Sequence, residues 1–185
     1  NFGNLLIGDT ARIEVLRGAQ STLWGSQAIG GVVNIVTAEP TEALQGSLDA
    51  EAGARGTTYF RGGIGGANER LSWRLAASRY DTDGFSAFAK GTEDDGYTNT
   101  GLSGRLNVKV TDAVSLDLRS VWSSGRNDFD AFNGDSREYG KTQELVAYAG
   151  LNIDLLGGQF RNRIGYAHTD TDRRNFNPDN QVQTL

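Results

Sequence analysis

Long segments in which apolar and polar residues alternate one by one dominate this chain from residue 41 onward. The clearest example spans residues 98–110, where the two parities differ sharply: Leu102, Leu106 and Val108 against Ser103, Arg105 and Lys109. Side chains of a β-strand point alternately to opposite faces, so this period of two predicts a strand with one apolar and one polar face. The same pattern predicts further strands near 46–54, 58–66, 70–80, 114–123, 144–154 and 159–170.

The predicted connections alternate in length. Short turns are expected at 65–69, 111–113 and 155–158, whereas longer polar loops are expected at 81–97 and 125–141. Short turns on one side and long loops on the other are typical of an outer-membrane β-barrel. Strands of about 10 residues also suit a tilted membrane crossing and exceed the usual length in globular proteins.

The charged residues indicate which face would meet lipid. A Lys or Arg on the lipid face near the bilayer midplane costs about 2–4 kcal/mol, so the polar face should line the lumen. The residues expected there are Arg105, Lys109, Asp117, Arg119 and Glu144, and those expected to form interfacial girdles are Trp73, Trp122, Phe160 and Tyr166. A soluble antiparallel sandwich with one wet face would show the same alternation and remains an alternative.

Composition excludes several classes of function. A net charge of −5 and a pI of about 4.9 give nucleic-acid binding no electrostatic support. The chain contains no cysteine, which excludes disulfides and thiolate metal sites. It begins without Met or a signal peptide and stops without a closing element, so we expect a piece of a longer polypeptide.

The N-terminal region has a different character. Residues 12–37 read RIEVLRGAQSTLWGSQAIGGVVNIVT, with two β-branched runs around a middle punctuated by glycine. Ser21 and Thr22 are expected to cap a short helix, and Gly30–Gly31 to form a tight turn into the second run. The segment lacks the Gly-Lys-Ser/Thr ending of a phosphate-binding loop.

This stretch resembles the C-terminal part of the plug of TonB-dependent outer-membrane receptors. The matching positions are Ile13–Gly18, Ser21, Leu23, Gly25, Ser26, Ala28–Gly31 and Val32–Thr37; Ala19 and Trp24 depart from the usual Pro and Tyr. The resemblance implies an all-β membrane protein, part of a plugged 22-stranded antiparallel transmembrane β-barrel with the C-terminal part of an α+β plug. Residues 1–40 would belong to that plug, and 41–185 would form about the first seven barrel strands.

The resemblance also implies a function. Such a receptor is not an enzyme; it sits in the outer membrane as a multi-pass β-barrel in contact with lipid. It takes up a bulky nutrient actively when the TonB protein engages a segment that lies outside this chain. Arg12, Glu14 and Arg17, placed on the polar face of their strand, would pair with the inner barrel wall and lock the plug.

Within the family, the predicted loops resemble those of the cobalamin receptors. The stretches concerned are RYDTDGFSAF at 79–88, GTEDDGY at 91–97 and GRNDFDAF at 125–132. In that subfamily, loop aspartates bind calcium, which prefers six to eight oxygen ligands. The resemblance implies the calcium ligands Asp83, Glu93, Asp94, Asp95 and Asp130, with Asp81, Asp128 and Asp135 as further candidates. Glu93 stands where Asp is expected, and plain solvated turns would be equally acidic.

Aromatic residues in the same predicted loops are candidates to contact the ligand or to pack the loops together. They are Phe85, Phe88, Tyr97, Phe129 and Phe132. Cobalamin is the first ligand that the resemblance suggests, and a siderophore or haem receptor of the same family is the alternative. A passive porin-like barrel and a soluble β-sandwich binding module are less favoured.

Overall fold

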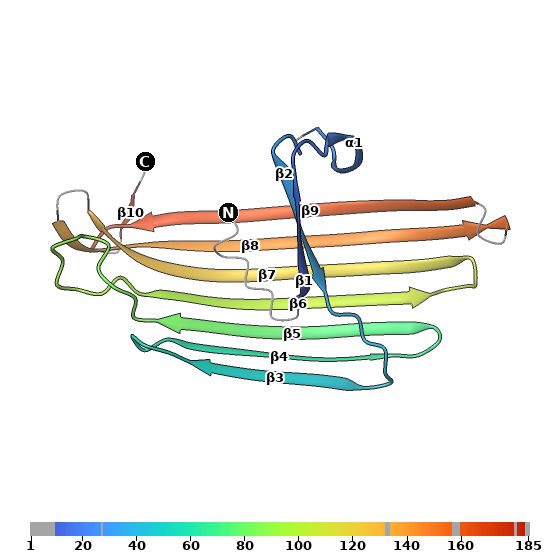
Figure 1. Ribbon diagram of the computed structural model, residues 1–185, viewed down its shortest axis with the longest axis horizontal. Coiled ribbons are helices and arrows are strands. Elements are labelled where there is room, and N and C mark those ends of the chain that lie inside the picture. Colours follow the sequence, from blue (N-terminus) through green and yellow to red (C-terminus); the bar gives the residue numbers. More distant parts are fainter. Residues whose placement is uncertain (1–9, 27, 132–133, 157–159, 180, 184–185) are drawn as a thin grey trace.

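The computed structural model describes residues 10–26, 28–131, 134–156, 160–179 and 181–183. It contains a two-stranded hairpin and a larger sheet whose strands follow one another in sequence order (Figure 1). No helix in these residues is long and apolar enough to span a bilayer. The elements in chain order are β1 (Thr10–Arg17), α1 (Ser21–Trp24), β2 (Gly31–Thr37), β3 (Gln45–Ala52), β4 (Thr58–Ala67), β5 (Leu71–Thr82), β6 (Tyr97–Lys109), β7 (Val114–Ala131), β8 (Gly134–Leu155), β9 (Phe160–Phe176) and β10 (Val182–Gln183).

The N-terminal hairpin joins the two β-branched runs in antiparallel register, with Glu14 opposite Asn34. Gly18 has a φ of 88°, a left-handed value that favours glycine, where the chain leaves β1. The cap of α1 differs from the expectation. Its N-cap is Gln20, which makes no side-chain capping bond, and the loop is instead closed by the backbone N–H of Gln20 donating to Ala28 O at 2.8 Å.

The larger sheet is antiparallel throughout, from β3 to β10. The short turn predicted at 111–113 and the loop between β5 and β6 agree with the sequence pattern, whereas the turn predicted at 65–69 begins only after Ala67. Residues 157 and 158 of the turn predicted at 155–158 lie outside the described residues. The long loop predicted at 125–141 is wrong. β7 and β8 continue through this segment and remain in regular register as far as Phe129 opposite Glu138, and after an irregularity Ala131 pairs with Gly134. Backbone pairing between adjacent strands does not require an apolar face, so hydropathy alone could not locate this extension.

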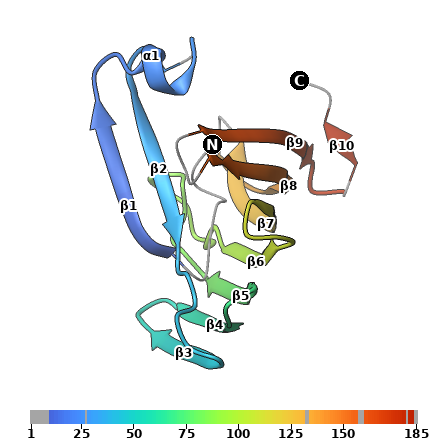
Figure 2. The same ribbon diagram turned by 90° about the vertical axis from the view of Figure 1, so that its right-hand side faces the viewer.

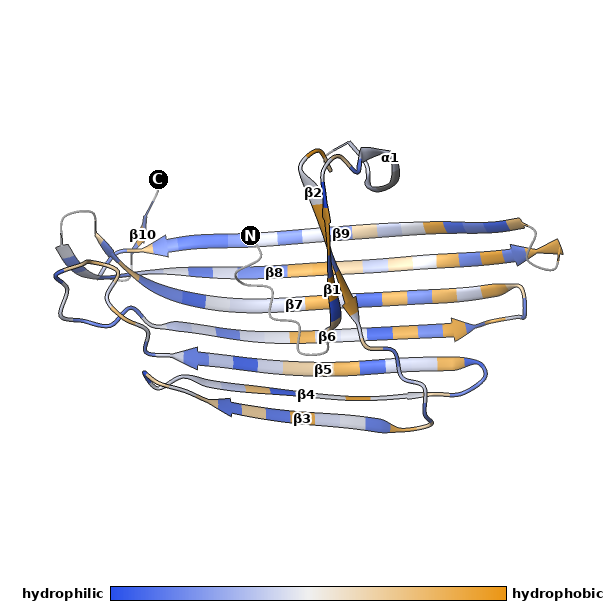
Figure 3. Cartoon of the chain, viewed as in Figure 1, coloured by the Kyte–Doolittle hydropathy of each residue, from blue (hydrophilic) through white to orange (hydrophobic). Residues whose placement is uncertain are grey.

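The sheet is curved, and the hairpin lies on its concave side (Figure 2). Every residue of the sheet that is both polar and buried points to this inner face: Arg74, Ser78, Asn99, Asp117, Ser123 and Thr142. The outer face carries large exposed apolar side chains, including Leu48, Phe60, Ile64, Leu75, Leu102, Leu145, Ile164 and Tyr166. Figure 3 shows the alternation of hydrophilic and hydrophobic residues along the strands.

The predicted facing of the charged residues is confirmed by the register. Arg105 lies opposite Arg119, Lys109 opposite Ser115 and Glu144 opposite Ser123, all on the inner face with Asp117. In the part of the chain that the structure describes, no second sheet covers the apolar outer face. A two-sheet sandwich would bury that face, so this arrangement disfavours the soluble alternative.

Candidate functional site

Charged residues gather in two places. One group lies on the inner face of the sheet opposite the hairpin, near the middle of the strands. The other lies at the long-loop end of the sheet, where the 83–96 loop between β5 and β6 meets the ends of β7 and β8. The two groups differ in the signs of their charges, and therefore in what they can bind.

The inner-face group is centred on Asp117, which is only 2% exposed. Its carboxylate accepts a hydrogen bond from Arg119 Nε at 3.0 Å and lies 3.8 Å from Arg105 Nε. Arg105 also forms an ion pair with Glu39, which follows the end of β2. Arg105 is therefore shared between a buried carboxylate of the wall and an exposed carboxylate of the chain leaving the hairpin.

A cavity of 620 Å³ separates β2 from the wall. Asn34, Val36 and Glu39 line it from the hairpin side, and basic and aromatic residues of the inner face line it from the other: Arg105, Arg119, Tyr148 and Arg163. The guanidinium of Arg119 lies 5.7 Å from the centre of the Tyr148 ring, in cation–π range. This side of the cavity offers more donors than acceptors.

At the long-loop end, carboxylates bind the backbone of the 83–96 loop. Asp130, near the end of β7, accepts hydrogen bonds from the backbone N–H groups of Phe88 at 2.7 Å and Ser136 at 3.0 Å. Asp95 accepts one from Ala87 N–H at 2.6 Å. These bonds fix the loop against β7 and bring acidic residues of distant sequence position together.

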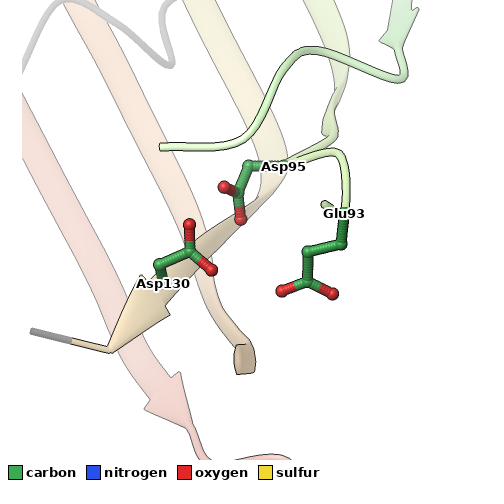
Figure 4. Close-up of side chains that lie close together, drawn as sticks. All are labelled: Glu93, Asp95 and Asp130. Atoms are coloured by element: carbon green, nitrogen blue, oxygen red, sulfur yellow. The ribbon is translucent and has the colours of Figure 1, made fainter. Parts of the chain in front are cut away.

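Three of these acidic residues converge. One carboxylate oxygen from each of Glu93, Asp95 and Asp130 lies within 4.8 Å of the others (Figure 4). Among the described residues, Glu93 Oε1 is buried without a hydrogen-bond partner. Oxygen ligands at this spacing match the preference of a hard divalent cation such as calcium.

The three carboxyl groups respond differently to this crowding. Loss of solvent, followed by the charge of Asp130, raises the pKa of Glu93. Loss of solvent also raises the pKa of Asp95, although the Ala87 N–H opposes the shift. The backbone N–H of Ser136 lowers the pKa of Asp130.

The other predicted calcium ligands lie around this cluster, and two of them, Asp94 and Asp128, line a pocket of 240 Å³ together with Glu93 and Asp95. Asp83 and Asp94 line a neighbouring pocket of 410 Å³ together with Asp128. Asp128 is engaged by Arg126 at 2.8 Å. Of the two remaining candidates, Asp81 pairs with Arg79, and Asp135 accepts the Thr92 N–H at 2.7 Å.

The predicted aromatic residues occupy varied positions. Phe85 is 67% exposed, with the Arg55 guanidinium 5.6 Å from its ring centre. Phe88 is held through its backbone by Asp130. Tyr97 and Phe129 lie on β6 and β7 rather than in loops, because both strands extend further than expected. Phe132 lies outside the described residues.

Sequence reasoning missed two residues of an aromatic ladder on the inner face. Tyr59, Tyr80 and Tyr97 stand on three adjacent strands with ring centres 6.1 and 5.9 Å apart. Only the cross-strand register brings them together, so no local sequence signal marks them. Glu39 was missed for the same reason, since its partner Arg105 is 66 positions away.

The three residues expected to lock the hairpin lie as follows. Arg12 and Glu14 form an ion pair with each other at 2.6 Å, and Asn34 donates to Glu14 at 2.8 Å. Arg17 does not share their face, which corrects the expectation. It is an odd number of residues from both, so it points to the same side as Val15.

Similarity to known proteins identifies the family. The chain is 31% identical over 183 residues to the vitamin B12 transporter BtuB of Photobacterium profundum, covering 96% of the chain. This chain belongs to the TonB-dependent outer-membrane receptors. No protein-family model matches it. The match covers 29% of the relative, so the chain spans less than a third of that protein.

Other TonB-dependent receptors match at similar identity over a smaller share of the chain. The ferric enterobactin receptor PirA of Pseudomonas aeruginosa is 31% identical over 160 residues, which is 75% of the chain and 21% of that receptor. The crystal structure of the siderophore receptor PirA from Pseudomonas aeruginosa superposes with a TM-score of 0.66 at 28% identity, covering 90% of this chain and 29% of that one. These are receptors of the outer membrane, so the apolar outer face of the sheet contacts lipid. Relatives named for two different ligands share the same identity with this chain, so identity does not separate the ligands.

Proposed function

We propose that this chain is part of a receptor for the TonB-dependent uptake of a bulky nutrient, cobalamin in the first place. The β1–β2 hairpin would be the end of the plug, and β3–β9 the first part of a 22-stranded wall. The observation that carries the cobalamin assignment is the convergence of Glu93, Asp95 and Asp130 at the long-loop end. The near-complete coverage of the chain by a vitamin B12 transporter supports it. The process needs no catalysis.

Calcium would complete the binding surface. Bound between Glu93, Asp95 and Asp130, the ion neutralises three carboxylates that otherwise repel one another. Asp83 and Asp94 would supply ligands in the neighbouring pocket. With the 83–96 loop fixed on β7, aromatic side chains would face the nutrient: Phe85, Phe88, Tyr97 and Phe129.

The plug would be held by charges until TonB pulls on it through a segment outside this chain. Arg12 and Glu14 would contact wall strands that this chain does not contain, and Glu39 holds the hairpin to Arg105. When the hairpin leaves, Arg105 keeps Asp117 as a partner. No buried charge is left without a partner, so the free-energy cost of releasing the hairpin stays low.

A ferric siderophore is the second candidate. It is favoured by the likeness to PirA and by two features of the inner face. The Tyr59–Tyr80–Tyr97 ladder offers stacking surfaces near the long-loop end, and the cavity beneath the hairpin is lined by Arg105, Arg119 and Arg163. Aromatic and basic groups together suit an anionic aromatic ligand.

Calorimetric titration of the full-length receptor with cyanocobalamin and with ferric enterobactin, in calcium or in a chelator, distinguishes the candidates. We expect tight cobalamin binding that weakens when calcium is removed. Ferric enterobactin binding without any calcium effect would instead assign the siderophore and return the acidic loop to a structural role.

Energised uptake tests the transport class itself. Scrambling residues 13–31 in the full-length receptor should abolish TonB-dependent uptake in cells while the receptor still reaches the membrane. Unchanged uptake by that variant would overturn the assignment of the hairpin to a plug. Conductance without TonB would favour a passive channel.

A further inference from the structure

The strands β7, β8 and β9 continue beyond the apolar band of the outer face. Trp122 and Leu145 lie opposite each other and end the continuous apolar band on β7 and β8; Tyr139 lies six residues further out on the same face of β8. Further along, hydrophilic residues prevail toward the left-hand ends of these strands in Figure 3. Because the long 83–96 loop lies at the same end, these ends are on the extracellular side.

Three basic residues form a row across these strand ends. Arg126 lies opposite Lys141, and Lys141 lies opposite Arg174, in uninterrupted register. All three share the outer face with Trp122. Adjacent strands are about 4.8 Å apart, so the three side chains start within about 10 Å of one another. We name Arg126, Lys141 and Arg174 the outer cation row.

An aromatic pair supports the row. The rings of Tyr139 and Phe176 stack with centres 4.7 Å apart at an interplanar angle of 11°. The Arg126 guanidinium lies 4.0 Å from the Tyr139 centre, and Lys141 Nζ lies 5.6 and 5.5 Å from the two centres. Cation–π contacts of this kind hold long side chains in place without neutralising them.

The row keeps unused hydrogen-bond donors on its two arginines and the charge of Lys141. Asp128 and Asp172 engage Arg126 and Arg174 through Nε and one Nη nitrogen, which leaves other N–H donors of each guanidinium available. Within the described ranges, Lys141 has no carboxylate partner at ion-pair distance. The arginine side chains are 47% and 60% exposed, so an anion outside the barrel can reach them.

We propose that the outer cation row binds the phosphate of a lipid headgroup in the outer leaflet. Lys141 and Arg174 face away from the lumen, so they cannot meet a nutrient on its way through the barrel, whereas Arg126 also borders the loop pocket of Asp83 and Asp94. The row follows Trp122 by four residues, or about 13 Å of strand, which is the level at which lipid headgroups begin. Arginine pairs and lysine are the side chains best suited to phosphate.

Vesicle binding tests this assignment on the full-length receptor. Phosphatidylcholine vesicles that contain diphosphorylated lipid A serve as the probe, and the same vesicles with dephosphorylated lipid A as the reference. Since each Lys or Arg near an anionic surface strengthens binding about fivefold, the triple variant Arg126→Gln, Lys141→Gln and Arg174→Gln should bind the probe at least about tenfold more weakly.

The matched control removes three basic residues at the short-turn end: Arg70→Gln, Lys109→Gln and Arg161→Gln. It should bind lipid A like the unchanged receptor. The single variant Lys141→Gln breaks no ion pair among the described residues and should weaken binding to lipid A about fivefold. It therefore tests the proposal even if the triple variant folds poorly.

Three results would overturn the proposal. The first is equal binding of the receptor to vesicles with phosphorylated and with dephosphorylated lipid A. The second is a loss of binding in the control variant equal to that in the triple variant. The third is full competition by inorganic phosphate at the same concentration as the lipid, which would indicate that the row binds a free anion. Nutrient binding and uptake should be unchanged in the double variant Lys141→Gln and Arg174→Gln, which leaves in place Arg126, the partner of Asp128 beside the loop pocket. A failure of this proposal is thus separable from a failure of the transport function.

Discussion

The charges of the inner wall and those of the long-loop end are organised in opposite ways. On the wall, Asp117 lies between two arginines and Arg105 between two carboxylates, so opposite charges satisfy one another. At the loop end, Glu93, Asp95 and Asp130 bring like charges together. The wall network is complete within the chain, whereas the loop cluster needs protons or a cation to become stable at neutral pH.

The largest expected effect comes from breaking the wall network. Asp117→Asn retains the shape of the side chain but leaves Arg105 and Arg119 without their shared carboxylate. Removing one partner of a buried pair costs about 3–5 kcal/mol, and the exposure of Arg119 reduces this to about 2 kcal/mol. Urea unfolding of the refolded full-length receptor measures the change. Asp154→Asn, at the exposed pair with Arg161, should stay within about 0.5 kcal/mol; equal effects would refute the network.

Neutralising one member of the loop cluster should have two effects of opposite sign. Glu93→Gln removes repulsion, so without calcium the loop becomes more resistant to proteolysis. The same change removes a charged ligand, so calcium affinity falls about tenfold or more. Limited proteolysis and calcium titration report the two effects separately. Asp112→Asn in the short turn after β6 is the control, and a Glu93 variant with unchanged calcium affinity would exclude Glu93 as a ligand.

The loop cluster should also respond to pH in a defined direction. The raised pKa values of Glu93 and Asp95 mean that the folded loop binds more protons than the unfolded loop. Without calcium, their contribution to loop stability is greatest at low pH and falls as pH rises above the usual values of 4.5 and 3.8. Asp130, with a lowered pKa, contributes in the opposite direction and loses its contribution as pH falls.

Calcium should reverse this dependence, because the ion binds ionised carboxylates and competes with protons. Calcium-dependent protection of the 83–96 loop from hydrogen exchange should therefore grow from acidic to neutral pH. Protection that does not change with pH would show that protons and calcium do not compete at these residues.

The sequence predicted those features that depend on local alternation. Strand positions and the inward facing of Arg105, Asp117 and Arg119 follow from a period of two, which the backbone imposes on neighbouring residues. The same rule places Arg17 on the opposite face from Glu14. The prediction that the two residues share a face was therefore wrong although the sequence contained the information needed.

The features that escaped prediction depend on contacts between distant residues. The continuation of β7 and β8 through 125–141 arises from pairing between strands that are polar on both faces there, so hydropathy carries no signal. The acidic residues of the loops could be named from their chemistry, but the choice of Glu93, Asp95 and Asp130 over Asp83 and Asp94 required the fold of the loop on β7. Glu39 was missed because its partner lies on another part of the chain.

The smallest expected change in stability tests the hairpin side of the wall network. Glu39 is 64% exposed, so Glu39→Gln should lower the free energy of unfolding by less than about 1 kcal/mol. Arg105 retains Asp117, which explains why the loss is small. The mobility of the hairpin should nevertheless increase, and a spin label at Thr37 would report it. A nearly unchanged free energy of unfolding together with a more mobile hairpin would show that Glu39 forms a detachable contact. If Glu39 stabilised the wall itself, its substitution would lower the free energy of unfolding as Asp117→Asn does.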